Sequence, residues 1–180
     1  MKIRKVTSED AARICEIYNY YILHTAVTFE TSAVFADEMR GRIESIIDSG
    51  DPYYVVERND KTIGYCYLHK WKERSAYDTT KEVTIYLDIK EQGKGIGTAL
   101  FKHMIDNLEP QKIHVLLAGI CLPNEASVKL HEKFGFRQVS CMKEIGRNLV
   151  DAVQQIIDED MQIEGSEHTS LWKGKEGACP

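Results

Sequence analysis

Three closely spaced glycines lie between a strand-like and a helix-like stretch in the middle of the chain, and this transition constrains the fold most. Residues Glu82 to Asp88 alternate apolar and polar side chains, which is the period of a strand with two different faces. From Ile96 to Leu108 the apolar residues recur at helical spacing, and Pro110 cannot extend that helix. The glycines of Gly93 to Gly97 therefore have to turn the chain from a strand into a helix.

The start of that helix is suited to bind an anion. The first backbone N–H groups of a helix lack intrahelical partners and carry the positive end of its dipole, and glycine lets phosphate oxygens approach closely. The spacing lacks the Gly-Lys-Ser/Thr of a P-loop, and its GxGxG run fits a dinucleotide fingerprint poorly. A pyrophosphate would fit, but a loop that only turns the chain explains the glycines equally well.

The other apolar patterns predict one α/β (mixed α+β) domain, with a mostly antiparallel twisted central sheet and helices on both faces. In chain order, the further expected elements are a strand at Ile3–Val6, helices at Ala12–Leu23 and Phe35–Ile47, a hairpin of Tyr53–Glu57 and Thr62–His69 turning at Asn59-Asp60, a strand at Ile113–Leu117, a helix from Asn124 to Lys133, and strands at Phe136–Met142 and Val150–Ile157. We expect the domain to span residues 1–157. Residues 158–180 are acidic and non-periodic, so we expect a tail of uncertain order.

Composition excludes several classes of function. The chain has 180 residues, of which 28 are acidic and 23 basic, and its net charge of -5 gives no electrostatic footprint for nucleic acid. No stretch approaches the roughly 20 apolar residues of a membrane span. The five cysteines form no CxxC pair, so we expect reduced thiols and a cytoplasmic location. We expect no metal site, because these histidines show no ligand spacing and are interpreted as structural: His24, His69, His103, His114 and His168.

The order of further motifs along the chain indicates a more specific function for the glycine loop. Gln92-x-x-Gly95-x-Gly97 follows a strand, and Asn124-x-x-Ser127 and the segment Leu130 to Phe136 (LHEKFGF) come later. In this order the sequence resembles the GNAT N-acetyltransferase superfamily. The resemblance implies a GNAT-like fold with acetyl-CoA as cosubstrate. It also implies that acetyl-CoA is bound by Ile85, Tyr86, Leu87, Gln92, Gly93, Lys94, Gly95, Ile96, Gly97, Thr98, Asn124 and Ser127. Asn124 is also suited to cap its helix, and Ile85 and Leu87 can belong to the core at the same time.

Further segments resemble the phosphinothricin and methionine sulfoximine acetyltransferase branch. They are Ile17-Tyr18-Asn19 with Thr28-Phe29-Glu30, and the stretch from Trp71 to Glu82. The similarity spans roughly residues 1–157 and fades after Arg147, where the branch usually carries a tryptophan that is Asn148 or Leu149 here. It implies a small amine as acceptor and a homodimer as the assembly.

Two residues are candidates for proton transfer. Acetyl transfer needs a neutral amine, so a carboxylate near the acceptor is useful as a base. Glu82 matches the general base of the branch, although it could be only an exposed glutamate at the start of a strand. His131 stands where many GNAT enzymes have a tyrosine, and it could protonate the departing thiolate. A histidine that only packs against its helix is equally compatible with the sequence.

The expected acceptor pocket comes from the resemblance. Five residues match positions that line this pocket in the branch, namely Phe29, Glu30, Arg74, Tyr77 and Thr80. An arginine there would suit the carboxylate of an amino acid, whereas Arg74 could also be a surface cation and Tyr77 a packed ring. A different class of function also remains open, a CoA-sensing module without turnover, as does a GNAT enzyme acting on a polyamine or a peptide N-terminus.

Overall fold

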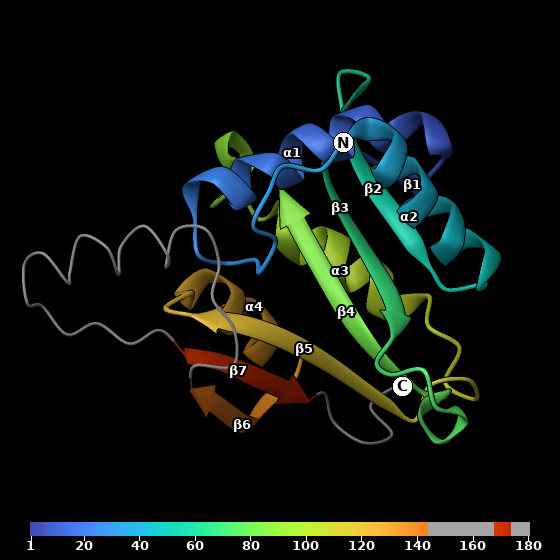
Figure 1. Ribbon diagram of the computed structural model, residues 1–180, viewed down its shortest axis with the longest axis vertical. Helices are drawn as coiled ribbons and strands as arrows, with labels where there is room; N and C mark the ends of the chain where they lie inside the picture. Colours follow the sequence, from blue (N-terminus) through green and yellow to red (C-terminus); the bar gives the residue numbers. More distant parts are fainter. Residues whose placement is uncertain (144–167, 174–180) are drawn as a thin grey trace, which may run out of the picture.

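The computed structural model describes residues 1–143 and 168–173, which form a seven-stranded sheet between two layers of helices (Figure 1). The strands are β1 (Lys2–Lys5), β2 (Tyr53–Arg58), β3 (Lys61–Lys70), β4 (Thr80–Leu87), β5 (Val115–Leu122), β6 (Arg137–Lys143) and β7 (His168–Lys173). The helices are α1 (Ala11–His24), α2 (Ala36–Asp48), α3 (Ile96–Asp106) and α4 (Glu125–Lys133), with short 3₁₀ turns η1 (Ser8–Asp10), η2 (Ser75–Tyr77) and η3 (Ile89–Glu91). The strand order is β1-β2-β3-β4-β5-β7-β6, and only the β4–β5 pair of the described strands is parallel. The expected mixed, mostly antiparallel fold is confirmed.

Each face of the sheet has its own hydrophobic core. α1 and α2 cover the face that lies in front in Figure 1, where they pack on Tyr53, Val55 and Tyr65. α3 and α4 lie behind the sheet, over a core that includes Tyr54 and Val56. Alternate residues of one strand therefore enter opposite cores, which explains why β2 reads as a continuous apolar run.

Most expected elements appear within a few residues of their predicted bounds. The hairpin of β2 and β3 turns at Asn59 and Asp60, which adopt positive φ angles of 51° and 58°, as a tight two-residue turn requires. The strand expected at Ile113–Leu117 instead begins at Val115 and continues to Leu122.

The C-terminal end of the sheet differs most from the expectation. β7 lies between β5 and β6 and is antiparallel to both, so the expected tail contributes a strand, and the domain boundary expected at residue 157 precedes the end of the sheet. An inserted strand gains backbone hydrogen bonds on both edges, so it can form without a strong side-chain pattern. The strand expected at Val150–Ile157 lies outside the described residues.

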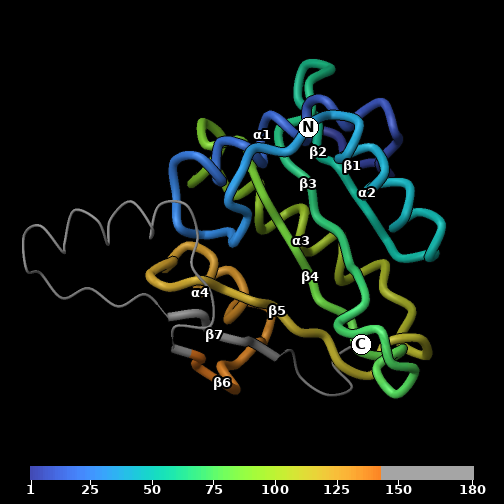
Figure 2. The backbone as a smooth tube through the Cα atoms, viewed as in Figure 1, coloured from blue at the N-terminus to red at the C-terminus, as the bar shows by residue number. Residues whose placement is uncertain are grey.

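β4 and β5 pair along only part of their length. The parallel ladder joins Thr80–Glu82 to Val115–Leu117 and ends there, whereas β4 stays paired with β3 up to Leu87. Figure 2 shows the two strands diverging beyond this point. Beyond Glu82 no described strand pairs with the β5-facing edge of β4. Backbone groups on that edge, apart from the Leu87 carbonyl that Tyr21 binds, are therefore available to a ligand.

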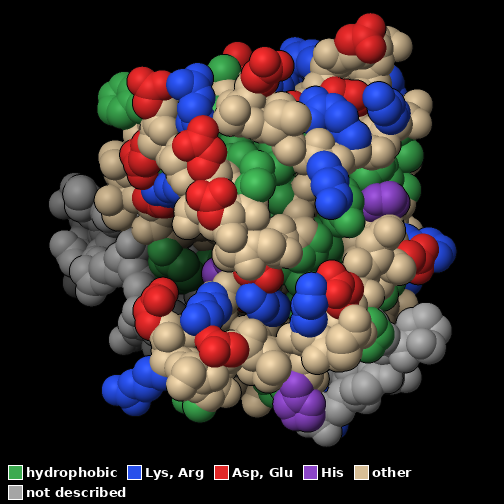
Figure 3. All heavy atoms as spheres, turned by 90° about the vertical axis from the view of Figure 1, so that its right-hand side faces the viewer, with side chains coloured by type: hydrophobic (Ala, Val, Ile, Leu, Met, Phe, Trp, Pro, Cys, Tyr) green, Lys and Arg blue, Asp and Glu red, His purple; other side chains and the backbone are tan. Residues whose placement is uncertain are grey.

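The surface carries charges of both signs. On the face shown in Figure 3, basic and acidic side chains are interspersed and no single-sign patch covers it. Within the described residues, no helix is long and apolar enough to cross a membrane.

Candidate active site

Glu82 lies where β4 and β5 begin to diverge. It is the last β4 residue paired with β5, and it stands opposite His69 of β3. Its side chain is 22% exposed. Burial raises the pKa of Glu82 above its ordinary value, and the opposing effects are the charge of His69 and a backbone hydrogen bond from Gly119. A carboxylate with a raised pKa accepts a proton more readily than an ordinary glutamate does.

Gly119 of β5 makes room for this carboxyl group. A Cβ atom added at Gly119 would lie 3.0 Å from Oε1 of Glu82, closer than ordinary side-chain contacts. The glycine therefore lets the carboxylate lie directly against the β5 backbone, within reach of its N–H group. No sequence pattern singled out Gly119, because its contact with Glu82 depends on the register of the parallel β4–β5 pair.

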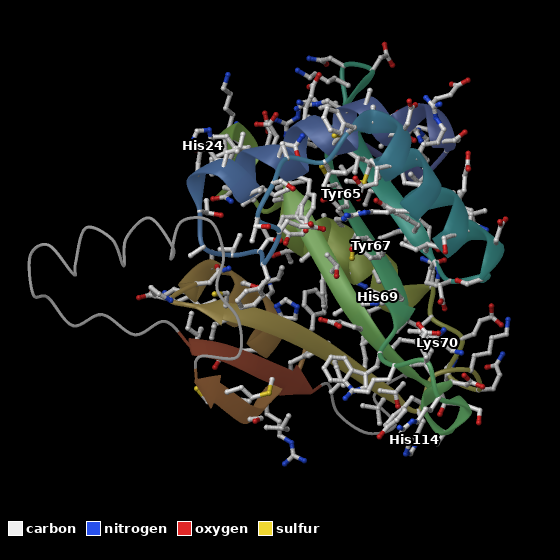
Figure 4. The ribbon with its side chains drawn as sticks, viewed as in Figure 1. His24, Tyr65, Tyr67, His69, Lys70 and His114 are labelled. Atoms are coloured by element: carbon white, nitrogen blue, oxygen red, sulfur yellow. The ribbon has the colours of Figure 1, made fainter. Side chains whose placement is uncertain are left out.

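Aromatic side chains continue from Glu82 along the same face of the sheet. Tyr65, Tyr67 and His69 follow one another along β3 (Figure 4), and the rings of Tyr67 and His69 are 5.7 Å apart. Burial raises the pKa of Tyr67 to about 12, so its phenol stays neutral at physiological pH. Tyr86 of β4 packs 5.6 Å from Tyr65. The base candidate therefore stands at the end of an uncharged aromatic wall.

The glycine loop, residues 92–98, has the geometry of an anion site. Gly95 is the N-cap of α3 with a φ of 75°, a conformation that favours glycine. The first hydrogen bond of the helix runs from the N–H of Ala99 to the carbonyl of Gly95, which leaves the amides of residues 96–98 available. Added Cβ atoms at Gly93 and Gly95 would meet no atom within 4 Å, so space is open above the loop. Lys94 is half exposed beside it.

Tyr21 of α1 connects this loop to the end of β4. Its hydroxyl donates a hydrogen bond to the carbonyl of Leu87 (2.5 Å) and accepts one from the side-chain amide of Gln92 (2.8 Å). Gln92 is thereby oriented by a buried residue far away in the sequence. Sequence reasoning missed Tyr21, because nothing in the helical pattern of α1 distinguishes it from an ordinary core residue.

Asn124 caps α4 as expected. Its Oδ1 accepts a hydrogen bond from the N–H of Ser127 (3.1 Å). A mostly apolar hollow of about 430 Å³ runs along this end of α4 and includes Asn124 and Val128 in its lining. The capping role is thus confirmed, and the hollow places Asn124 at a surface that a ligand can reach.

His131 lies on α4 and is 2% exposed. Its Nδ1 is 2.8 Å from the carbonyl of Ser127, and its ring packs edge-on against Phe101 and Phe136. Burial lowers the pKa of His131, although the hydrogen bond to Ser127 opposes this effect. The ring is therefore neutral with its proton on Nδ1, and Nε2 is buried without a hydrogen-bond partner among the described residues. Nε2 can accept a proton or a hydrogen bond, but it can donate only after the ring has been protonated.

Only some of the residues expected to bind the acceptor line the same cavity. Arg74 and Tyr77 line a cavity of about 530 Å³, and so does Lys70, the residue after His69. Thr80 starts β4 beyond the same loop. Phe29 and Glu30 follow α1 and are not part of that lining.

Glu30 has a partner of its own. It forms an ion pair with Arg42 of α2 (2.7 Å), so its carboxylate is already engaged. Phe29, by contrast, is exposed. The structure therefore supports Arg74 and Tyr77 as lining residues more directly than it supports Phe29 and Glu30.

Comparisons with known proteins identify the family of the chain. Residues 3–161 match the model of the acetyltransferase (GNAT) domain. The chain is 34% identical to the phosphinothricin N-acetyltransferase of Streptomyces coelicolor over 151 residues, which cover 82% of this chain and 88% of that protein. It is also 34% identical to the L-methionine sulfoximine/L-methionine sulfone acetyltransferase of Salmonella typhimurium over 146 residues, which cover 81% of this chain and 85% of that protein.

A solved structure shares the whole architecture. The phosphinothricin acetyltransferase of Sinorhizobium meliloti, solved in complex with acetyl-CoA, superposes with a TM-score of 0.83 at 26% identity and covers 99% of this chain and 91% of its own. Because the family model spans most of the chain and these relatives share a third of its residues over four fifths of its length, the chain belongs to the GNAT family of acetyltransferases.

Proposed function

We propose that this enzyme transfers the acetyl group of acetyl-CoA to the amine of a small amino-acid analogue, such as phosphinothricin, methionine sulfoximine or methionine sulfone. The relatives named for these compounds align over four fifths of the chain. One observation carries the proposal: Glu82, whose pKa is raised, stands where β4 and β5 diverge. It lies between a loop suited to a pyrophosphate and a cavity lined by the cationic side chain of Arg74.

Acetyl-CoA fits the residues that are present. The open amides at the start of α3 and the space above Gly93 and Gly95 suit its pyrophosphate, with Lys94 adding positive charge. The unpaired edge of Ile85–Leu87 offers backbone groups to the pantetheine arm, and one N–H there can polarise the thioester carbonyl. Asn124 and Ser127, at the N-terminal end of α4, are the further proposed contacts of acetyl-CoA.

Glu82 is the proposed general base. An amino acid binds as an ammonium ion, which cannot attack a carbonyl until it loses a proton. Glu82 accepts this proton directly or through a water molecule, and the amine nitrogen then attacks the thioester carbon. The C–N bond forms as the C–S bond breaks. The nitrogen then loses its second proton to become a neutral amide, and the departing CoA thiolate takes up one proton and leaves as the free thiol.

His131 is the proposed partner of the departing thiolate. Its buried Nε2 lacks a hydrogen-bond partner among the described residues, which favours a contact with a ligand. Because the ring is neutral, it acts as an acid only after it has gained a proton. In His131→Phe, which keeps the packing against Phe101, turnover should fall while acetyl-CoA still binds.

Arg74 is the proposed contact for the carboxylate of the acceptor. No ion-pair partner of its guanidinium is found among the described residues, so it is available for a substrate anion. Tyr77 and Thr80 would border the same substrate, and Phe29 with Glu30 would close the pocket from the loop after α1. This pocket favours amino acids over polyamines, which carry no carboxylate.

The release of free thiol from acetyl-CoA tests the proposed function. Phosphinothricin, methionine sulfoximine and methionine sulfone should each produce thiol and an acetylated product of matching mass, whereas a polyamine and a peptide N-terminus should react more slowly. Tight binding of acetyl-CoA without thiol release from any acceptor would instead identify a CoA-sensing module.

Assembly and location complete the proposal. We infer a homodimer from the resemblance to the phosphinothricin branch, and light scattering should give twice the chain mass. We infer a cytoplasmic location because Cys15, Cys66 and Cys141 are free thiols, as is usual in a reducing compartment.

A further inference from the structure

We propose that His69 is the proton partner of Glu82: it takes over the proton that Glu82 accepts from the amine and passes it on to solvent. This inference rests on the proposed role of Glu82 as the base. From the sequence alone His69 was interpreted as structural, since it matches no ligand spacing.

The strand register brings the two residues together. His69 on β3 and Glu82 on β4 are direct cross-strand partners, and Nε2 of His69 lies 3.6 Å from Oε2 of Glu82. His69 is 38% exposed and Glu82 is 22% exposed, so the histidine is the more open of the two to solvent. Figure 4 shows His69 following Tyr65 and Tyr67 along the strand.

A second contact determines which nitrogen of His69 carries the proton. Nδ1 is 3.0 Å from the carbonyl oxygen of Lys70, and a carbonyl oxygen can only accept a hydrogen bond. The Nδ1 atom is therefore protonated, and in a neutral ring Nε2 presents a lone pair toward Glu82. A lone pair facing an ionised carboxylate repels it, so the contact is favourable only when one proton resides on Nε2 or on the carboxyl group.

The other charged groups near this pair are bound to partners of their own. Tyr67, next along β3, is neutral because burial raises its pKa. Arg42 of α2 reaches this face but is bound to Glu30 and to Glu38 of its own helix. Lys70 is paired with Asp78. β5 contributes Gly119, which has no ionisable side chain. Among the described residues, His69 is the charged group that acts on the pKa of Glu82.

The position of the pair suits a proton relay. An N–H bond of the substrate ammonium breaks as an O–H bond forms on Glu82. That O–H bond then breaks as an N–H bond forms on Nε2 of His69, and the imidazolium releases its proton to water. The more buried carboxylate is thereby restored for the next turnover without having to exchange its proton with solvent directly.

A comparison of the imidazole nitrogen signals by NMR tests the pairing without any activity. In Glu82→Gln the Nε2 atom of His69 loses its carboxylate partner, so its chemical shift at neutral pH should change clearly from that in the unmodified enzyme. The signals of His24, an exposed histidine at the far end of α1, should be the same in both proteins (Figure 4). An unchanged Nε2 signal of His69 would overturn the pairing, whether or not Glu82 proves to be the base.

Kinetics test the relay. In His69→Gln the carboxylate loses its positive neighbour, so the acid limb of the kcat/KM profile should move to higher pH, and kcat should fall several-fold. Exogenous imidazole should restore part of kcat to His69→Ala, because the site is open to solvent, but it should not restore Glu82→Gln. The control His24→Gln should match the unmodified enzyme.

A profile of His69→Gln that superimposes on the unmodified one, together with no effect of imidazole on His69→Ala, would overturn the relay. If Glu82→Gln is fully active while His69 still shifts, the proposed base fails and the pairing stands.

Discussion

The hydroxyl of Tyr21 and the side-chain amide of Gln92 lie 2.8 Å apart, although 71 residues separate them in the sequence. Tyr21 donates its own proton to the carbonyl of Leu87, so a single buried phenol fixes the end of β4 and the first residue of the glycine loop. α1 thereby helps to shape the site proposed for the pyrophosphate.

Tyr21→Phe removes this link and keeps the packing of the ring. Two polar groups lose their partner, so we expect a stability loss of about 1–3 kcal/mol in urea unfolding. The KM for acetyl-CoA should rise several-fold while the KM for the acceptor changes little. Tyr20→Phe is the matched control, since Tyr20 is exposed on the same helix. Equal KM values for acetyl-CoA in the two variants would contradict the role of Tyr21.

Gly119→Ala should disturb Glu82 without disturbing the glycine loop. The added Cβ would stand 3.0 Å from Oε1 of Glu82 and push the carboxylate away from the β5 backbone. We expect kcat to fall about ten-fold or more, as a misplaced base would, with little change in acetyl-CoA binding measured by calorimetry. Gly41→Ala in α2 is the control, because an added Cβ there meets no atom within 4 Å. A fully active Gly119→Ala enzyme would show that this glycine does not position the carboxylate.

Arg74→Gln should affect only acceptors with a carboxylate. Loss of the guanidinium should raise the KM for methionine sulfone by about ten-fold or more and leave the KM for its methyl ester nearly unchanged. Arg40→Gln, at an exposed position of α2, serves as the control. Similar KM changes for the acid and the ester would rule out recognition of the carboxylate by Arg74.

The carboxyl group of Asp10 should make the folded state less stable as the pH falls into the acid range. Burial tends to raise the pKa of Asp10, but hydrogen bonds from Arg4, Thr7 and Thr62 outweigh this effect and lower it below its ordinary value. A carboxyl group with a lowered folded-state pKa stabilises the fold above its unfolded pKa of about 3.9, and the contribution is lost as the pH falls through the folded value. The unmodified protein should therefore lose more stability than Asp10→Asn between about pH 5 and pH 3 in urea unfolding. Parallel losses in the two proteins would contradict this role.

The sequence predicted the elements whose patterns are local. The alternation of Glu82 to Asp88 and the glycines before Ile96 specify a strand, a turn and a helix within one continuous segment, and the structure has all three. The cap at Asn124 and the turn at Asn59 and Asp60 are equally local, since neighbouring residues determine them.

The rest depended on register and long-range packing. His69 acquires its position only because the loop between β3 and β4 sets it opposite Glu82, and no pattern in β3 shows this. Gly119 depends in the same way on the parallel pairing of β4 with β5. β7 was missed because its place between β5 and β6 depends on hydrogen bonds to strands remote in the sequence.

The most direct test of the proposed mechanism is the pH dependence of kcat/KM for Glu82→Gln, measured by thiol release with methionine sulfoximine from about pH 5 to pH 9. Glutamine keeps the shape of the side chain but cannot accept the proton of the ammonium group. We predict a fall of at least about 100-fold at neutral pH, with the acid limb of the profile abolished and acetyl-CoA binding retained. A rate within about two-fold of the unmodified enzyme across this range would contradict the assignment of Glu82 as the base.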